Sequence, residues 1–232
     1  MRDKRRNTEG SPPELISDPD QKARAEARNG VRQLDKAHEW ISAFLDPGYD
    51  RPFRLTQDMI LELNYLAIEG IETFAGTYRN GEVEINASEH KPPSPFRVAS
   101  LVVEMCDYVN ENFDSKEALH LAAYIMWRLN WIHPFFDANG RTSRVVSYLV
   151  MCIKLRILLP GTKTMPEIIS ENREPYYRAL EFADQKSDER TVDVSDMESL
   201  LSKLLVGQLL SAHPEAQGLI PKRRGLSRKQ RV

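Results

Sequence analysis

Two apolar stretches that flank a short polar segment constrain this chain more than any other feature of its sequence. Drawn as helices, residues 118–132 and 141–156 are apolar around most of their circumference, so both are expected to be buried. The nine residues 133–141 read HPFFDANGR, and Pro134 disfavours helical geometry at the residue before it, which places the end of the first helix at His133. The sequence therefore predicts a polar loop held between two buried helices, a common position for a functional site.

The residue types in and after this loop favour binding of a phosphate group. Asn139 and Gly140 stand at the predicted start of the second helix, where free backbone N–H groups and the positive end of the helix dipole attract an anion. Asp137 offers an oxygen ligand suited to Mg²⁺. Arg141 and Arg144 offer charge and paired N–H donors for further phosphate oxygens. We interpret the segment as a nucleotide-phosphate site.

His133 is the residue of this segment that titrates near neutral pH, which makes it the candidate general base. Taken singly, these residues also have structural explanations, because His-Pro can simply end a helix and Asp-Ala-Asn-Gly can simply form a turn and a cap. Five chemically active residues within nine positions are harder to explain in that way. We therefore expect a phosphate site with a proton acceptor beside it.

The segment resembles the signature of the Fic family, which has the Fido fold and whose pattern is His-Pro-Phe-x-(Asp/Glu)-Gly-Asn-Gly-Arg. Residues 76–79 (GTYR), with Val83 and Ile85, resemble the family's short hairpin called the flap, and residues 90–93 (HKPP) resemble the exit from it. The resemblance covers roughly residues 56–213. It implies an all-α helical bundle with one small β-hairpin beside the active-site loop. It also implies an enzyme, a protein adenylyltransferase that transfers AMP from ATP to a Ser, Thr or Tyr hydroxyl of a target protein.

Carried over by motif position, the resemblance implies a role for each residue of the loop. His133 would deprotonate the target hydroxyl, and Asp137 would hold the Mg²⁺. Three residues would grip the α- and β-phosphates and a fourth would reach the γ-phosphate: Asn139, Gly140 and Arg141, and then Arg144. ATP and Mg²⁺ are therefore the expected substrate and metal ion.

Ala138 departs from the family pattern, which most often has Gly at this position. Its methyl group removes a positive-φ option and narrows the approach to the phosphate. If the backbone does not need a positive φ, the cost is well under about 1 kcal/mol. We expect the loop to form, with nucleotide affinity or choice open to change.

Two other kinds of function stay open. The first keeps the site but changes its chemistry, to another nucleotide, to removal of AMP, or to phosphate transfer as in the Doc branch. Doc-type proteins are shorter and tend to carry Lys where this chain has Gly140, which argues against that branch. The second is a catalytically silent regulatory module that binds nucleotide without turnover. The intact His133 and Asp137 argue against it.

The rest of the chain reads as helices joined by short loops. We expect a disordered basic N-terminal tail (1–20), an N-terminal helical extension (21–50), a Fido domain (51–213) with its flap at about 76–95, and a basic C-terminal tail (214–232). Apolar periodicity and capping residues predict helices at 21–45, 56–70, 165–170, 175–184 and 194–211. Asp114 is a candidate cap for the helix around residue 118, and Asn80-Gly81 is a hairpin turn signal within the flap.

The predicted hairpin borders the site, so we assign it a role in target binding rather than only a connection between helices. An exposed strand edge binds an extended segment of another protein through main-chain hydrogen bonds. Docking along the flap would place a target hydroxyl beside His133. The expected partner is therefore a target protein bound along the flap hairpin.

Inhibition is not settled by the sequence. Many Fic proteins carry an inhibitory helix with the pattern (Ser/Thr)-x-x-x-Glu-(Gly/Asn), whose Glu pairs with the arginine equivalent to Arg144. Glu69-Gly70 fits the end of this pattern, but position 65 is Tyr and the flap follows within six residues, so we assign Glu69 to the first helix of the core. Inhibition through Glu26 of the N-terminal helix, by a separate inhibitor protein or in a homo-oligomer stays open.

Composition and charge indicate a soluble intracellular protein. No stretch is apolar and long enough to cross a membrane, and the N-terminus lacks the pattern of a signal peptide. Cys106 and Cys152 are interpreted as buried thiols. The net charge is −2, with basic residues gathered at both ends, but no aromatic residues interleave them, which argues against nucleic-acid binding. We expect a cytoplasmic protein without membrane contact, with export as an effector left open.

Overall fold

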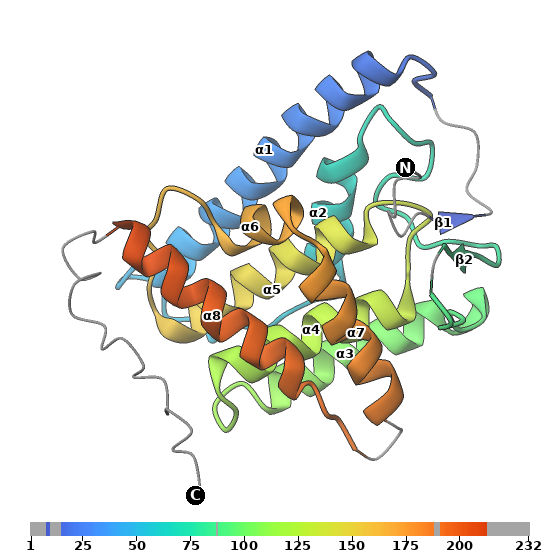
Figure 1. Cartoon of the computed structure of the whole chain (residues 1–232). Helices are drawn as coiled ribbons and strands as arrows, with labels where there is room; N and C mark the ends of the chain where they lie inside the picture. Colours follow the sequence, from blue (N-terminus) through green and yellow to red (C-terminus); the bar gives the residue numbers. More distant parts are fainter. Residues whose placement is uncertain (1–7, 10–14, 87, 188–190, 213–232) are drawn as a thin grey trace, which may run out of the picture.

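The computed structural model describes residues 8–9, 15–86, 88–187 and 191–212, and within them the fold is almost entirely helical (Figure 1). In chain order the elements are β1 (Thr8–Glu9), α1 (Pro19–Leu45), α2 (Gln57–Ile68), β2 (Glu84–Ile85), the 3₁₀ helix η1 (Pro95–Arg97), α3 (Val98–Glu111), α4 (Ala118–Ile132), α5 (Asn139–Leu155), α6 (Met165–Glu171), α7 (Glu174–Lys186) and α8 (Ser195–Ala212). The prediction of an all-α bundle is confirmed.

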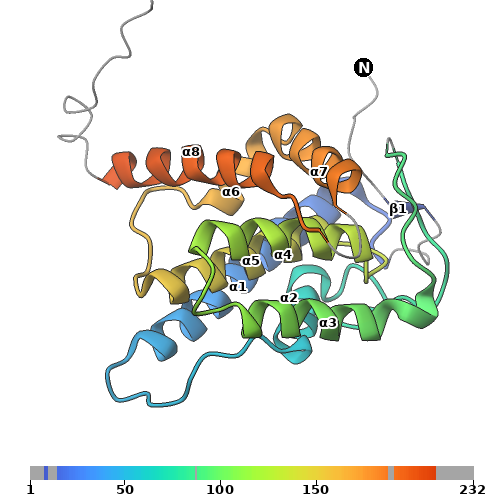
Figure 2. The ribbon, with the colours of Figure 1, turned by 90° about the horizontal axis from the view of Figure 1, so that it is seen from below.

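Helices α4 and α5 pack closely against each other at the centre of the bundle. On α5 lie α1 and α2, and on α4 lie α3, α7 and α8. Figure 2 shows α7 and α8 on one side of the central pair and α2 and α3 on the other. Because the polar loop connects the two central helices, both of its ends are anchored in the core.

The polar loop begins where the sequence predicted and ends close to the predicted place. α4 ends at Ile132, and His133 takes a left-handed backbone conformation (φ 50°, ψ 58°) that stops the helix before Pro134. α5 begins at Asn139, two residues earlier than expected. The boundaries of the other five helices that the sequence predicted are also confirmed to within two residues, with Thr56 capping α2 through a hydrogen bond from the Met59 N–H (3.4 Å). No boundaries were predicted for α3.

The structure does not use Asp114 as the cap of α4. The helix begins at Ala118 after Glu117, which makes no capping hydrogen bond through its side chain. Residues 112–116 instead form a turn, in which the Lys116 N–H donates to the Asn112 carbonyl (3.0 Å). Burial of the apolar surface of α4, rather than a cap, therefore sets where this helix starts.

The flap segment does not fold back on itself as the hairpin that Asn80-Gly81 predicted. Its strand, β2, pairs antiparallel with β1, in a register that sets Thr8 opposite Ile85. The arm before the turn bonds elsewhere, because the backbone N–H of Arg79 donates to the Pro134 carbonyl (2.8 Å). The polar loop thus takes the hydrogen bond that a second hairpin strand would have used.

The remaining sequence predictions concern the tails, the cysteines and the membrane. The C-terminal tail and most of the N-terminal tail lie outside the described residues. Within those residues, no helix combines the length and the apolar character needed to cross a bilayer. Both cysteines are free and buried, and burial raises the pKa of Cys106 to about 12 and that of Cys152 to about 11. These thiols therefore stay protonated near neutral pH and belong to the core.

Candidate active site

The polar loop, the start of α5 and four further helices, α1, α4, α6 and α7, line an open cavity of about 810 Å³. Residues of α1 form one wall, and residues of α6 and α7 form another. The predicted site residues all line this cavity: His133, Asp137, Asn139, Gly140, Arg141 and Arg144. The structure therefore brings together every residue that the sequence singled out, and their roles remain predictions.

His133 is buried, and hydrogen bonds hold both its ring and its backbone carbonyl. Its Nδ1 lies 3.3 Å from the Asn130 carbonyl oxygen, and because a carbonyl only accepts, Nδ1 carries the proton in this contact. The His133 carbonyl accepts from Nε of Arg79 (2.7 Å), a buried guanidinium that also donates to the carbonyls of Gly81 and Pro93. A neutral imidazole that carries its proton on Nδ1 has its acceptor lone pair on Nε2, as a general base requires.

The start of α5 presents backbone donors to the cavity. The Asn139 side chain is turned to the loop instead, where it accepts from the Phe135 N–H (2.9 Å) and donates to the Phe135 carbonyl (2.8 Å). The first helical hydrogen bond runs from the Thr142 N–H to the Ala138 carbonyl (2.8 Å), so the N–H groups of residues 139–141 have no acceptor within the helix. Of the groups of Asn139, the backbone N–H is therefore the one that can bind a phosphate, because the side chain bonds to Phe135.

Ala138 adopts a left-handed conformation (φ 62°, ψ 16°), so the loop does need the positive φ that glycine adopts freely. An L-residue in this region costs roughly 1–2 kcal/mol. Its methyl group is buried against Ala67 and Ile68 of α2, and a buried methyl group returns about 0.8 kcal/mol. The low cost expected for Ala138 assumed that the backbone there does not need a positive φ. The structure shows a positive φ at Ala138, so the loop carries backbone strain at this residue.

Arg144 is a buried guanidinium that makes no hydrogen bond or ion pair with any residue described by the structure. It lies over the ring of Tyr176, 5.9 Å from its centroid, and above Gly140, where a Cβ would come within 3.2 Å of its Nη1. Burial lowers the pKa of Arg144, and the positive charges of Arg173 and Arg141 lower it further. A buried charge without a counter-ion is costly, so this position fits a bound anion.

The ring beneath Arg144 is fixed by a buried hydrogen-bond network. The Tyr176 hydroxyl accepts from Nδ2 of Asn130 (2.7 Å) and lies 3.2 Å from the Ser143 hydroxyl. Asn130 also donates to the Ser143 hydroxyl (2.8 Å), and its carbonyl faces His133. This network therefore ties the candidate base and the anion position into one rigid unit across α4, α5 and α7.

Asp137 lies at the cavity with its side chain 43% exposed. Its Oδ1 accepts from the Ala138 N–H (2.5 Å), and its Oδ2 lies 3.3 Å from Arg141, which also faces Glu26 of α1 at 3.6 Å. The described residues contain no group of three or more metal-ligating side chains. A single accessible carboxylate fits a Mg²⁺ ion that takes its other ligands from nucleotide phosphates and water.

Glu72 is a second carboxyl group near Asp137, and it is buried. Its Oε1 accepts from the Phe74 N–H (3.0 Å), while Oε2 has no hydrogen-bond partner among the described residues. Burial raises the pKa of Glu72, and the negative charge of Asp137 raises it further. Burial therefore disfavours the charged form of Glu72 relative to a carboxyl group in water.

Sequence reasoning missed the residues that hold the loop from other elements. Asn64 of α2 donates to the Asp137 carbonyl (3.1 Å) and accepts from the Gly76 N–H (3.0 Å). The feature of the sequence that could have revealed Asn64 is its position as a single amide in the mostly apolar stretch ILELNYLAI. Arg79 was noticed only as part of the flap pattern, and Tyr176 was not noticed, because its contacts come from residues far away in the sequence.

A sequence model of the Fic/DOC family matches residues 54–151. A curated relative, the protein adenylyltransferase Fic of Drosophila willistoni, is 29% identical over 160 residues, which are 68% of this chain and 29% of that protein. The protein of the same name from Drosophila persimilis is 30% identical over the same length and shares. The chain thus spans only 29% of the length of these two relatives.

Solved structures of Fic proteins share the fold. A Fic family protein from Desulfovibrio desulfuricans G20 matches with a TM-score of 0.57 at 20% identity, covering 88% of this chain and 55% of that one. Fic-1 (residues 134–508) from C. elegans matches with a TM-score of 0.60 at 21% identity, covering 83% of this chain and 52% of that one. The signature loop and the helical fold agree with this match, and residues 54–151 are similar to the Fic/DOC family.

Proposed function

We propose that this protein transfers AMP from ATP to a hydroxyl group of a target protein. The proposal depends on one observation: His133, the open N-terminus of α5 and the buried Arg144, without a counter-ion, line the same cavity. A base beside a deep anion site suits transfer of a phosphorus group from a polyphosphate. The name of the curated relatives, protein adenylyltransferase, supports AMP as the transferred group.

In the proposed reaction, Nε2 of His133 takes the proton of the target hydroxyl while its oxygen attacks the α-phosphorus of ATP. The bond from that phosphorus to the bridging oxygen breaks, and pyrophosphate leaves with the electron pair. The N–H groups of residues 139–141 hold the α- and β-phosphates, and Arg144 holds the γ-phosphate. These donors stabilise the negative charge that moves onto the leaving group.

Asp137 is the residue that would hold Mg²⁺, which neutralises phosphate charge when bound. Two hydrogen bonds fix the position of this carboxylate. Asn64 donates to the backbone carbonyl of Asp137, and the Ala138 N–H donates to its Oδ1.

Asp137→Asn keeps an acceptor for the Ala138 N–H but removes the charge. Calorimetry should show ATP binding to the wild type at least about tenfold weaker after chelation, and little metal dependence in the variant. Asp58→Asn, at an exposed position of α2, is the control. Equal affinity of the wild type with and without metal would remove Asp137 from this role.

We also propose that the target docks along β2. The chain's own Thr8–Glu9 already pairs there, which supports the edge as a place for an extended segment, and Ile85 of β2 lines the cavity with His133. A target strand would replace β1. Deleting residues 1–12 should therefore raise target labelling without changing ATP affinity. Unchanged labelling would argue against this edge.

The test of the activity uses ATP labelled at either the α- or the γ-phosphate, a cell lysate as a source of targets, and mass spectrometry of the modified proteins. Wild-type protein should transfer the α-label only. His133→Ala should lower transfer by about 10²–10⁴. His133→Asn serves as a second variant, because Asn tolerates the left-handed backbone at this position.

Other outcomes would point to the other functions. Transfer of the γ-label would indicate phosphate transfer. ATP binding without transfer of either label would favour a nucleotide-binding module, and full transfer by both His133 variants would refute the role of the base.

A further inference from the structure

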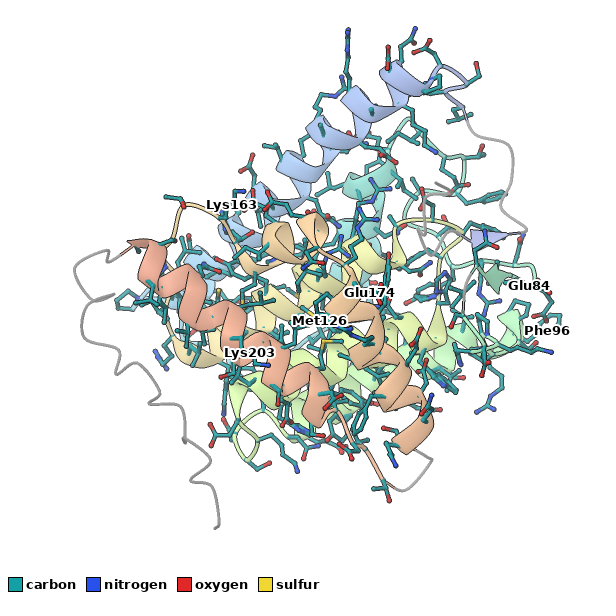
Figure 3. All side chains as sticks on the ribbon, in the orientation of Figure 1. Glu84, Phe96, Met126, Lys163, Glu174 and Lys203 are labelled. Atoms are coloured by element: carbon teal, nitrogen blue, oxygen red, sulfur yellow. The ribbon has the colours of Figure 1, made fainter. Side chains whose placement is uncertain are left out.

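Arg173 is a third guanidinium at the cavity, and nothing in the motif accounts for it. It lies directly before α7, whose first residue, Glu174, is labelled in Figure 3, and it lines the cavity with a half-buried side chain. Its Nε donates to the Ser170 carbonyl (3.3 Å), which fixes the root of the guanidinium. Among the residues that the structure describes, none forms a hydrogen bond or ion pair with its two terminal nitrogens.

Two acidic side chains at the cavity, Glu26 and Glu167, are engaged with groups other than Arg173. Glu26 faces Arg141, and Glu167 accepts from both the N–H and the hydroxyl of Thr164 in the cap of α6. Arg173 is also close enough to Arg144 for the two positive charges to repel each other. Gathering like charges in a half-buried site costs free energy that a polyanion would return.

The order of groups along the cavity indicates which part of a nucleotide meets Arg173. His133 lies at the end of α4, the N–H groups of residues 139–141 lie at the start of α5, and Arg144 lies one turn further along α5. Arg173 lines the same cavity from the start of α7, and its charge acts on Arg144, so it faces the end of a polyphosphate that is farthest from the base.

We propose that Arg173 binds the terminal phosphates of the nucleotide together with Arg144 and stabilises pyrophosphate as it leaves. This inference rests on the proposed AMP transfer. As the target oxygen forms its bond to the α-phosphorus, the bond to the bridging oxygen breaks and its electron pair passes to pyrophosphate, while the hydroxyl proton passes to His133. Arg173 supplies charge and N–H donors at the group that gains the negative charge.

The test compares binding of ATP, AMP and inorganic pyrophosphate, each with Mg²⁺, by calorimetry. Arg173→Ala should weaken binding of ATP and of pyrophosphate by about ten- to a hundredfold, as for loss of a charge-assisted hydrogen bond. Binding of AMP, which lacks both terminal phosphates, should not change. Arg173→Lys should restore part of the loss. Arg178→Ala, an exposed arginine of the same helix that does not line the cavity, is the matched control.

The possible failures can be told apart. If Arg173→Ala leaves the ratio of ATP to AMP affinity unchanged, Arg173 only supports the connection from α6 to α7 and the inference is wrong. If the wild type binds pyrophosphate and ATP but transfers no AMP, the proposed activity fails while the pyrophosphate measurement still decides the role of Arg173. If the wild type binds neither, both proposals fall.

Discussion

Two residues in left-handed backbone conformations, His133 and Ala138, give the signature loop its shape. Each is held by tertiary contacts: Arg79 fixes the carbonyl of His133, and the methyl group of Ala138 packs against α2. Positive φ is costly for residues with a Cβ, and such strain persists only where the surroundings determine the conformation. The two strained residues therefore lie before and after Asp137 in the sequence. Their backbone conformations direct both the imidazole of His133 and the start of α5 toward the cavity.

The strain at Ala138 can be measured by removing its Cβ. Ala138→Gly relieves roughly 1–2 kcal/mol of backbone strain and loses about 0.8 kcal/mol of methyl burial, so it should leave stability unchanged or raise it by up to about 1 kcal/mol. Ala67→Gly is the matched control, because Ala67 belongs to the same apolar cluster but lies within a helix. The control should lose about 1.5–2 kcal/mol from methyl burial and helix propensity together. Equal losses in chemical denaturation would show that packing, not strain, dominates at Ala138.

The buried carboxyl of Glu72 should make stability depend on pH. Its pKa is raised in the folded state, so folding favours the protonated form over the charged one relative to the unfolded chain. The contribution of Glu72 to the free energy of unfolding is fully present below the ordinary carboxyl pKa of 4.5 and is lost as the pH rises through the folded pKa. Glu72→Gln should therefore be more stable than the wild type near pH 8 and show no such gain near pH 4. Denaturation curves at the two pH values would contradict the burial argument if the difference were the same at both.

At the scale of elements, helix positions could be predicted because their signals are local. Pro134 ends α4, Thr56 caps α2, and apolar periodicity marks the other predicted helices, whereas α3 was not predicted. The flap hairpin could not be predicted correctly from Asn80-Gly81, since the competing hydrogen bond to Pro134 comes from a residue far away in the sequence. The position of α1 across the cavity is equally a long-range result, set by buried contacts such as that from Gln33 to the Leu63 carbonyl (2.9 Å).

Helix α1 brings Glu26 to within 3.6 Å of Arg141, where its carboxylate competes with a phosphate for the same guanidinium. Glu26→Gln should therefore raise ATP affinity by up to about fivefold, the size expected for a partly exposed ion pair. Glu69→Gln is the control, because Glu69 pairs with Arg32 of the same helix and does not line the cavity. Equal effects of the two substitutions on calorimetric affinity would show that α1 acts only by supporting the fold. A larger rise in the control would instead return Glu69 to the inhibitory role that its position argues against.

For the whole molecule, the sequence was sufficient where one segment carries both structure and chemistry. The residues of the signature loop reach one cavity because two central helices anchor its ends. The sequence was insufficient for contributions from other elements, such as Asn64, Arg79 and Arg173, because each depends on how distant helices pack. The sequence also did not show where the Asn139 side chain points, and in the structure both of its polar groups bond to Phe135.

Nucleotide binding should be visible as stabilisation of the entire fold. ATP with Mg²⁺ at a hundred times its Kd should add about 2.7 kcal/mol, which raises the Tm of a chain of this size by roughly 5–10 °C. His133→Asn should keep this rise, because the phosphate contacts come from the start of α5 and its arginines.

Arg144→Met should behave in the opposite way. A buried guanidinium without a counter-ion destabilises the free protein, so an apolar side chain of similar volume should raise the Tm without nucleotide while most of the ATP-dependent rise is lost. Thermal denaturation of the wild type, His133→Asn and Arg144→Met, each with and without ATP, measures both effects. A variant that is less stable alone and still responds fully to ATP would mean that Arg144 stabilises the packing around Tyr176 rather than the nucleotide. A higher Tm without nucleotide, together with loss of most of the ATP-dependent rise, would mean that Arg144 destabilises the free protein in order to form an anion site. Binding of the nucleotide at that site would then restore the lost stability.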